Sequence, residues 1–160
     1  MQFLFMALFA LTVVGVDQLV KYLVMTNIAP YPFQEEFIPG ILSLTYTTND
    51  GAAFSMMRGM QWLFVVIFVI LTALLVFEYF KKPLPFTKFE RWCIAAIYGG
   101  GLGNVIDRVF RDGKVVDMFK TEFMDFPIFN VADIFITCGC TLLLVHLVFF
   151  NKSFWKDEKK

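Results

Sequence analysis

Acidic residues beside long apolar segments are the groups in this sequence best suited to chemistry. Four carboxylates meet that description: Asp17, Asp107, Asp117 and Asp133. Asp17 lies four residues before Lys21, so the two would share one face of a helix and can form an ion pair. Asp107 adjoins Arg108. A neighbouring cation keeps an acid ionised, so these two acids suit structural pairs better than proton transfer.

The other two acids, Asp117 and Asp133, suit a pair that activates water. Two carboxyls held close together share one proton, so that one acts as a base and the other as an acid. Asp133 enters an apolar segment and has no basic residue within a dozen positions. Asp117 has apolar residues on both sides, but Lys114 and Lys120 are also near in the sequence. The residues alone therefore leave the choice of Asp117 open.

Nucleophilic and metal-dependent hydrolysis both lack the residues that they require. A serine or cysteine nucleophile needs a histidine, and the single histidine is His146. It stands 13 residues beyond Asp133, which is about 20 Å along a helix axis. We expect it to be a packed or hydrogen-bonded helix residue. A zinc site lacks an HExxH motif and a cysteine pair at metal spacing, so we expect no metal and no cofactor.

The composition indicates a membrane protein. The chain has 160 residues, of which 58% are hydrophobic, whereas soluble domains are about 45–50% apolar. Residues 1–160 are expected to form a single domain. The 14 basic and 14 acidic residues cancel, so the net charge gives no indication of a nucleic-acid partner.

Four apolar segments are long enough to cross a hydrocarbon core of about 30 Å. Their approximate ranges are 3–25, 61–80, 92–109 and 129–150. Segments 81–91 and 151–160 carry an excess of basic residues, whereas 26–60 carries an excess of acidic ones. Positively charged connections remain in the cytoplasm. We therefore expect both termini to be cytoplasmic, and Asp117 and Asp133 to meet near the outer leaflet.

The third predicted span carries a polar stripe near its outer end. At about 100° per residue, four of its residues fall on one face: Gly100, Asn104, Asp107 and Arg108. Gly99 and Gly103 form a small-xxx-small pattern that lets another helix approach closely. Ionisable groups at the edge of a membrane span are usually functional.

The two outer connections are predicted to form a platform over the membrane. Residues 40–48 are typical of a strand, and Asn49-Asp50-Gly51 predicts a turn into a returning strand. Residues 111–128 mix charges with aromatic side chains, which is typical of an amphipathic segment on the bilayer surface. The fourth span begins at Asn130, a residue that can cap a helix. The fold class is thus an all-α membrane protein with four transmembrane helices, a small extracytoplasmic β-hairpin or sheet, and an outer amphipathic connection.

Two other classes of protein compete with hydrolysis by a carboxylate pair on these observations. Intramembrane carboxylates also mark proton- or ion-coupled transporters, although here they gather at one face, and no inverted repeat relates the halves. A non-catalytic scaffold subunit could use the glycines for helix contacts.

Five motifs occur in the order of one known family. They are Asp17-Gln18-x-x-Lys21, Thr48-Asn49-x-Gly51-Ala52-Ala53-Phe54-Ser55, Gly100-x-x-Gly103-Asn104-x-x-Asp107-Arg108, Val116-Asp117-Met118 and Phe129-Asn130-x-Ala132-Asp133. Together they resemble the bacterial lipoprotein signal peptidase, or signal peptidase II, over nearly the whole chain. One departure is Met118, where the family often has phenylalanine.

The resemblance implies an aspartyl endopeptidase of the bacterial plasma membrane. Its substrates would be diacylglyceryl-modified prolipoproteins, cut just before the lipidated lipobox cysteine. Asp117 and Asp133 would be the catalytic pair. The residues that would bind substrate or support the pair are Asn49, Gly100, Asn104, Arg108, Asn130, Ala132, Asp17 and Lys21. The expected partners are membrane lipids and peptide antibiotics such as globomycin, and the expected oligomeric state is a monomer.

Overall fold

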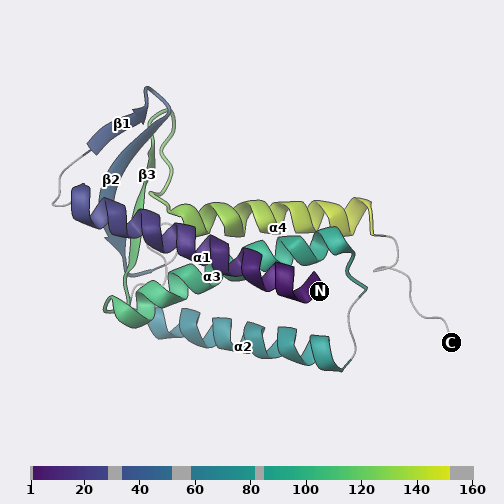
Figure 1. Ribbon diagram of the computed structural model, residues 1–160. Helices are drawn as coiled ribbons and strands as arrows, with labels where there is room; N and C mark the ends of the chain where they lie inside the picture. Colours follow the sequence, from purple (N-terminus) through teal and green to yellow (C-terminus); the bar gives the residue numbers. More distant parts are fainter. Residues whose placement is uncertain (1, 29–33, 52–58, 82–84, 152–160) are drawn as a thin grey trace.

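The computed structural model describes residues 2–28, 34–51, 59–81 and 85–151. Within these ranges, helices lie roughly side by side and a small sheet projects from one end of them (Figure 1). The helices are α1 (Gln2–Asn27), α2 (Gln61–Phe80), α3 (Lys88–Phe110) and α4 (Val131–Phe149). The start of α1 and the end of α4 lie away from the sheet.

Three of the described helices are long and apolar enough to cross a membrane, namely α1 from Phe3, α2 and α4. Helix α3 has 23 residues, which is about 35 Å at 1.5 Å per residue. Its charges set it apart, because Lys88, Glu90, Arg91 and the Asp107-Arg108 pair all belong to it. Three of the four predicted spans are therefore supported, and the third in the chain stays a prediction.

Helix α3 is the centre of the bundle, because α1, α2 and α4 all pack against it. Glycines make both approaches close. A Cβ at Gly99 would stand 2.8 Å from the carbonyl oxygen of Ala10 in α1. One at Gly103 would stand 2.6 Å from Oδ2 of Asp17, also in α1. The prediction that Gly99 and Gly103 let another helix approach closely is thus confirmed.

The sheet has three described strands in the order β1-β2-β3, and both pairings are antiparallel. They are β1 (Gln34–Ile38), β2 (Leu42–Asn49) and β3 (Val115–Thr121). Val116 and Met118 of β3 are buried with Val24 of α1, and Leu44 and Tyr46 of β2 pack against them. This apolar cluster anchors the sheet to the last turns of α1.

The predicted platform exists, but its strands pair differently from the expected hairpin. The strand predicted at 40–48 is present as β2, and the turn after it holds a bond from the Gly51 N–H to Asn49 Oδ1 of 2.9 Å. The returning strand predicted after this turn would begin in 52–58, which lies outside the described residues. The observed neighbours of β2 are β1 and β3, which come from before it and from much later in the chain.

Part of the second outer connection is a strand instead of a surface segment. The prediction for 111–128 missed β3 because its first four residues, 115–118, are all buried. A strand covered on both faces shows no alternation of polar and apolar residues. Its signature is therefore difficult to separate from that of an amphipathic segment.

The end of the bundle remote from the sheet holds a second polar cluster. Glu90 is fully buried, and its carboxylate accepts bonds from the Thr87 N–H at 2.6 Å and from Asn151 Nδ2 at 2.7 Å. His146 Nδ1 lies 2.8 Å from Glu90 Oε1. The expectation that His146 is a packed, hydrogen-bonded residue far from Asp133 is confirmed. This cluster joins the start of α3 to the end of α4.

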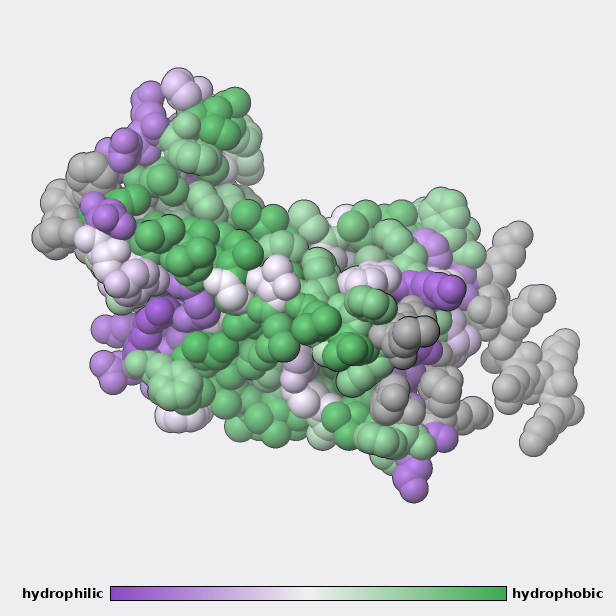
Figure 2. Space-filling model, in the orientation of Figure 1, coloured by the Kyte–Doolittle hydropathy of each residue, from purple (hydrophilic) through white to green (hydrophobic). Residues whose placement is uncertain are grey.

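The surface of the bundle is apolar between two polar ends. On the face shown in Figure 2, hydrophobic residues cover the middle of the helices, and hydrophilic residues gather toward the sheet and toward the opposite end. Many large apolar side chains of the helices are exposed, among them Leu11, Leu19 and Leu71. Such a band is typical of a protein whose solvent is lipid.

Candidate active site

Asn130 holds the two candidate carboxyls together at the start of α4. Its side-chain oxygen accepts a bond from the backbone N–H of Asp133 at 2.9 Å, and its own N–H donates to Asp133 Oδ2 at 3.1 Å. This reciprocal arrangement is a capping box, which fixes Asp133 in the first turn of the helix. The Asn130 side chain also donates from Nδ2 to Asp117 Oδ1 at 2.7 Å. One residue therefore contacts both acids.

Strand β3 brings Asp117 to the helix α4 from the other side. The backbone N–H groups of Met118 and Phe119 both donate to the carbonyl of Phe129, at 3.0 and 2.8 Å. Phe129 immediately precedes the cap residue Asn130, so the strand is fastened to the chain that enters α4. The sheet thus fixes the position of Asp117 relative to the capping box.

Asp117 has an environment that favours its neutral form. It is buried in β3, and burial together with the neighbouring Asp133 raises the pKa of Asp117 to about 7. Hydrogen bonds from the side chains of Asn130 and Asn49 oppose that rise. A carboxyl that holds its proton to neutral pH next to a second acid is the arrangement in which one acid donates and the other accepts.

Asn104 of α3 contacts the Asp133 oxygen that the cap does not bind. Its Nδ2 donates to Asp133 Oδ1 at 2.9 Å. Its oxygen accepts bonds from Lys21 Nζ at 3.0 Å and from Asn130 Nδ2 at 3.1 Å. Asn104 of α3 therefore connects Lys21 of α1 to Asp133 and to the cap residue Asn130.

A buried ion network lies beneath the two acids. Asp17, Lys21 and Asp107 are each fully buried, and Lys21 Nζ lies 2.8 Å from Asp17 Oδ2 and 2.9 Å from Asp107 Oδ2. The predicted pairing of Asp17 with Lys21 is confirmed. The expected pairing of Asp107 with Arg108 is wrong, because Lys21 and Arg111 are the cations bound to Asp107. Consecutive residues on a helix point in directions about 100° apart, so adjacency in sequence misled here.

Arg108 turns instead toward the sheet and α2. Its Nη2 donates to the carbonyl of Gly51 at 2.9 Å, and its Nη1 donates to the carbonyl of Asn104 at 3.2 Å. The guanidinium carbon lies 4.5 Å above the centre of the Phe64 ring. Its Nε is buried and has no hydrogen-bond partner among the residues that the structure describes. A buried donor without a partner is costly unless something binds there.

Gly100 and Ala132 are the point at which α3 meets α4. A Cβ at Gly100 would stand 2.5 Å from the carbonyl oxygen of Ala132 and 2.9 Å from Cγ1 of Ile136. The Ala132 N–H donates to Asp17 Oδ1 at 2.9 Å. These two residues therefore set the spacing between Asn104 on α3 and Asp133 on α4, and they bring no reactive side chain of their own.

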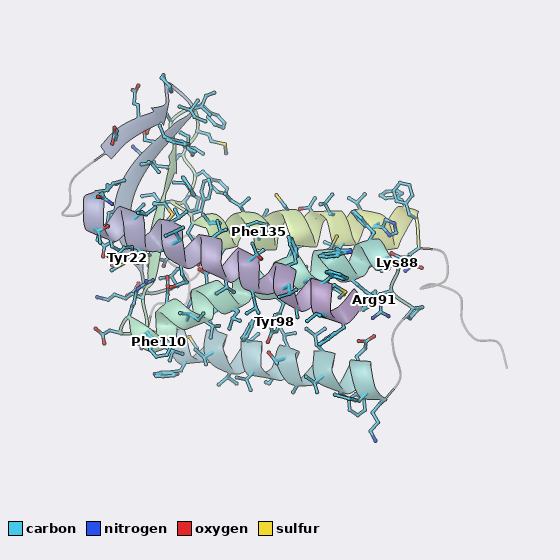
Figure 3. The ribbon with its side chains drawn as sticks, viewed as in Figure 1. Tyr22, Lys88, Arg91, Tyr98, Phe110 and Phe135 are labelled. Carbon is cyan, nitrogen blue, oxygen red and sulfur yellow. The ribbon has the colours of Figure 1, made fainter. Side chains whose placement is uncertain are left out.

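A cavity of about 420 Å³ opens onto this cluster. Its polar lining includes Asn49, Asn104, Arg108, Asp117 and Asp133. Its apolar lining comes from residues 126–129 and from the first turns of α4. Every residue named in the sequence-based site thus lies in one connected cluster. In Figure 3, Lys88 and Arg91 mark the end of α3 remote from the sheet and Phe110 the end beside it, which puts Asn104 and Arg108 in the half nearer the sheet.

Phe64 is a site residue that the sequence did not indicate. Helix α2 is almost entirely apolar, and one phenylalanine among 21 gives no signal of its own. The structure gives it a role because its ring supports the Arg108 guanidinium. Asp107 was considered but placed with the wrong cation, as described above.

Comparison with known proteins decides the family. A family model described as signal peptidase (SPase) II matches residues 9–149. The chain belongs to the signal peptidase II family. Among curated relatives, the lipoprotein signal peptidase of Streptococcus pyogenes serotype M2 (strain MGAS10270) is 41% identical over 145 residues, covering 91% of this chain and 89% of that protein. The same figures hold for the enzyme of serotype M1.

Solved structures agree with this assignment to signal peptidase II. A bacterial membrane enzyme determined by the in meso method at 2.3 Å resolution superposes with a TM-score of 0.78 at 35% identity, covering 97% of this chain and 93% of that one. A second such structure, at 1.9 Å resolution, also gives 0.78 at 35% identity. Signal peptidase II enzymes cleave the signal peptides of prolipoproteins. The transporter alternative finds no support.

The contact between Phe64 and Arg108 leads to a testable expectation for a signal peptidase II. Phe64→Leu should lower kcat/KM about 5-fold, because a cation over an aromatic ring is worth about 0.5–2 kcal/mol and its loss frees the guanidinium to move. Phe77→Leu on the same helix is the matched control, since Phe77 is 62% exposed. Peptide cleavage by the two purified variants measures the difference, and equal activities would show that the ring does not position Arg108.

Proposed function

We propose that this protein is an aspartic endopeptidase that removes the signal peptide from diacylglyceryl-modified prolipoproteins, cutting just before the lipidated lipobox cysteine. Asp117 and Asp133 are its catalytic residues. The observation that carries this proposal is that one cap residue, Asn130, hydrogen-bonds to both acids, and that both acids line the same cavity. Membership of the signal peptidase II family supports the substrate class.

The reaction follows from the two protonation states of the pair. The ionised acid takes a proton from a water molecule as the water oxygen attacks the scissile carbonyl carbon. The protonated acid gives its proton to the carbonyl oxygen, which produces a neutral tetrahedral intermediate. The intermediate then collapses, the C–N bond breaks, and a proton passes to the leaving amine of the lipidated cysteine. The side chains of Arg108 and Asn49 line the cavity and would bind the carbonyl groups of the extended substrate.

The substrate would reach this site from within the membrane. Lys88 and Arg91 lie at the end of α3 remote from the sheet (Figure 3), and that end would face the cytoplasm. Helix α3 would then be the fourth span, both termini would be cytoplasmic, and the acid pair would lie near the outer leaflet of the bacterial plasma membrane. A peptide held by two acyl chains stays at that depth, where its scissile bond meets the pair.

Asp117 provides a pH dependence for this mechanism. Its pKa is raised to about 7 by burial and by Asp133, so the neutral form is available as an acid below that pH. Above pH 7 Asp117 loses its proton, and two anions replace the working pair. We therefore expect kcat to fall about tenfold per pH unit above about 7. A cleavage profile from pH 4 to pH 9 measures this, and a profile that stays flat through pH 9 would exclude Asp117 as the acid.

The proposed function can be separated from its alternatives with purified protein. In detergent, cleavage of a lipidated lipobox peptide supports the peptidase, and globomycin would be expected to inhibit it. In liposomes, proton or ion flux without cleavage would indicate a transporter. Neither activity would favour a scaffold subunit. The protein is expected to act as a monomer without a cofactor, which size measurement and chelator treatment of the cleaving preparation would test.

A further inference from the structure

Asn104 lies between a buried cation and one of the two proposed catalytic acids. Lys21 enters from α1 and is fully buried. A lysine ammonium has three N–H donors and no acceptor. Its three donors have three oxygen partners: Asp17 Oδ2 at 2.8 Å, Asp107 Oδ2 at 2.9 Å and Asn104 Oδ1 at 3.0 Å. The Asn104 atom that faces Lys21 must therefore be the oxygen.

A second donor fixes the same orientation. The Asn104 oxygen also accepts a bond from Asn130 Nδ2 at 3.1 Å. If the amide rotated by half a turn, its NH₂ group would face the ammonium of Lys21 and the NH₂ of Asn130. Donors would then oppose donors inside the protein, which is unfavourable because buried polar groups need partners. Lys21 and Asn130 together thus lock the amide of Asn104.

The locked amide presents its NH₂ group to Asp133. Asn104 Nδ2 donates to Asp133 Oδ1 at 2.9 Å, and the Asn130 backbone N–H donates to Asp133 Oδ2 at 3.1 Å. Both oxygens of Asp133 thus receive donors, which suits a carboxylate. Asp117 receives bonds from Asn130 and Asn49 as well, but it is almost fully buried, at 3% exposure. The two acids therefore differ in burial and in the origin of their donors.

We infer that Lys21 is a positioning residue that fixes the amide of Asn104 so that Asp133 begins the reaction as the ionised acid, the base, while Asp117 holds the shared proton. This inference rests on the proposed peptidase function and adds a division of labour between the two acids. Lys21 itself does not touch the substrate cavity. It acts on the reaction through Asn104.

The charged groups that face the pair come from two helices. Lys21 approaches from α1, and Arg108 approaches from α3, where both acids act on it electrostatically. Asp107 lies behind them and is already bound by Lys21 and Arg111. Removing Lys21 therefore takes away a cation and the orienting donor of Asn104, while Arg108 stays in place.

The test compares Lys21→Met with a matched control, Gln18→Met. Gln18 bonds to Asp17 and Asp107 in the same network but not to Asn104. Lys21→Met should lower kcat at least 30-fold with KM changed less than 3-fold. It should also move the basic limb of the pH profile to higher pH, because the Lys21 charge is one of the causes that lower the pKa of Asp117. Gln18→Met should leave that limb in place.

A double-mutant cycle asks whether the effect passes through Asn104. In an Asn104→Leu background, the further change Lys21→Met should alter kcat less than about 3-fold, because contacting residues are not additive. Lys21→Gln, which keeps a donor for the Asn104 oxygen, should recover part of the lost activity. If Lys21→Met does not fold, Lys21→Gln takes its place in the comparison with Gln18→Met and in the double-mutant cycle.

Cleavage by the wild-type protein is measured first. This result tests the proposed function independently of the positioning role of Lys21. Without wild-type cleavage of the lipidated peptide, the proposed function is wrong. If the wild type cleaves, this inference is overturned by a basic limb that stays unchanged in both Lys21 variants. An equal shift of that limb in the Gln18→Met control would overturn it as well. So would a double variant whose loss of kcat is the product of the losses in Lys21→Met and Asn104→Leu.

Discussion

Asp117→Asn and Asp133→Asn are each expected to lower kcat/KM for a lipidated lipobox peptide by at least about 10³-fold. In the proposed mechanism Asp117 supplies a proton and Asp133 takes one from water, and an amide can do neither. General acid–base catalysis by one positioned group contributes roughly 10²–10⁴-fold, and each replacement removes one member of a pair that works together. Initial rates with the purified variants in detergent measure the loss. Retained processing by either variant would contradict the assignment.

The control for these variants must show that the protein is still folded. Asp125→Asn is suitable, because Asp125 is exposed in the same outer connection as Asp117, and its activity should match the wild type. Both catalytic-site variants should still insert into membranes and bind globomycin-like ligands at least partly. Loss of cleavage together with retained binding separates a chemical defect from a collapsed site.

The titration of Asp117 predicts how stability should change in the same variants. The folded protein keeps the Asp117 proton up to about pH 7, whereas the unfolded chain releases it near the reference value of 3.8. The native state thus binds more protons in that interval, and wild-type stability falls as pH rises from about 4 to about 7. Asp117→Asn cannot titrate, so it should lose less stability over that range. Thermal unfolding at pH 4 and pH 8 would reveal the difference.

Gly100→Ala is expected to be the most damaging exchange for the arrangement of the helices. The added Cβ would stand 2.5 Å from the carbonyl oxygen of Ala132, and a backbone atom inside a capped helix cannot move aside alone. Helices α3 and α4 must separate, which moves Asp133 away from Asn104. Overpacking costs about 1–3 kcal/mol, and a misplacement near 1 Å costs about 10²-fold in rate. We expect a Tm about 5 °C lower and kcat/KM down at least 10²-fold.

Gly101→Ala is the control one residue further along the chain. Its Cβ would meet carbon atoms of the Phe68 ring at 3.1 and 3.2 Å, and a side chain on the loosely packed α2 can adjust. We expect near-normal stability and activity. If Gly101→Ala damages the enzyme as much as Gly100→Ala, the contact with Ala132 is not what sets the site.

The sequence indicated the site better than it indicated the sheet. Charged and amide residues near apolar spans are few, so Asn104, Asn130 and the acids were conspicuous, and motif order placed them together. Asn130 was recognisable as a cap because capping depends on a local pattern of residues. The strand β3 was missed because its burial on both faces removes the alternation that identifies strands. The pairing of β2 with β3 joins segments about 70 residues apart, and no local pattern encodes it.

The direction of side chains on helices was the other limit. Asp107 and Arg108 are neighbours in sequence, yet one faces Lys21 and the other faces Gly51. Which of several nearby cations an acid binds depends on how α1 and α3 are rotated against each other, and glycine positions alone do not fix that rotation. Phe64 is a second example. Its ring lies at Arg108 because of how α2 packs beside α3, and the sequence of α2 does not indicate that packing.

The most direct test of the account is to identify the cleavage products of one diacylglyceryl-modified lipobox peptide and its unlipidated twin by mass spectrometry. The purified protein should make a single cut immediately before the lipidated cysteine, cut the unlipidated peptide far more slowly, and lose the cut in Asp133→Asn. A cut at another bond, equal cleavage of both peptides, or an unchanged product from the Asp133→Asn variant would contradict it.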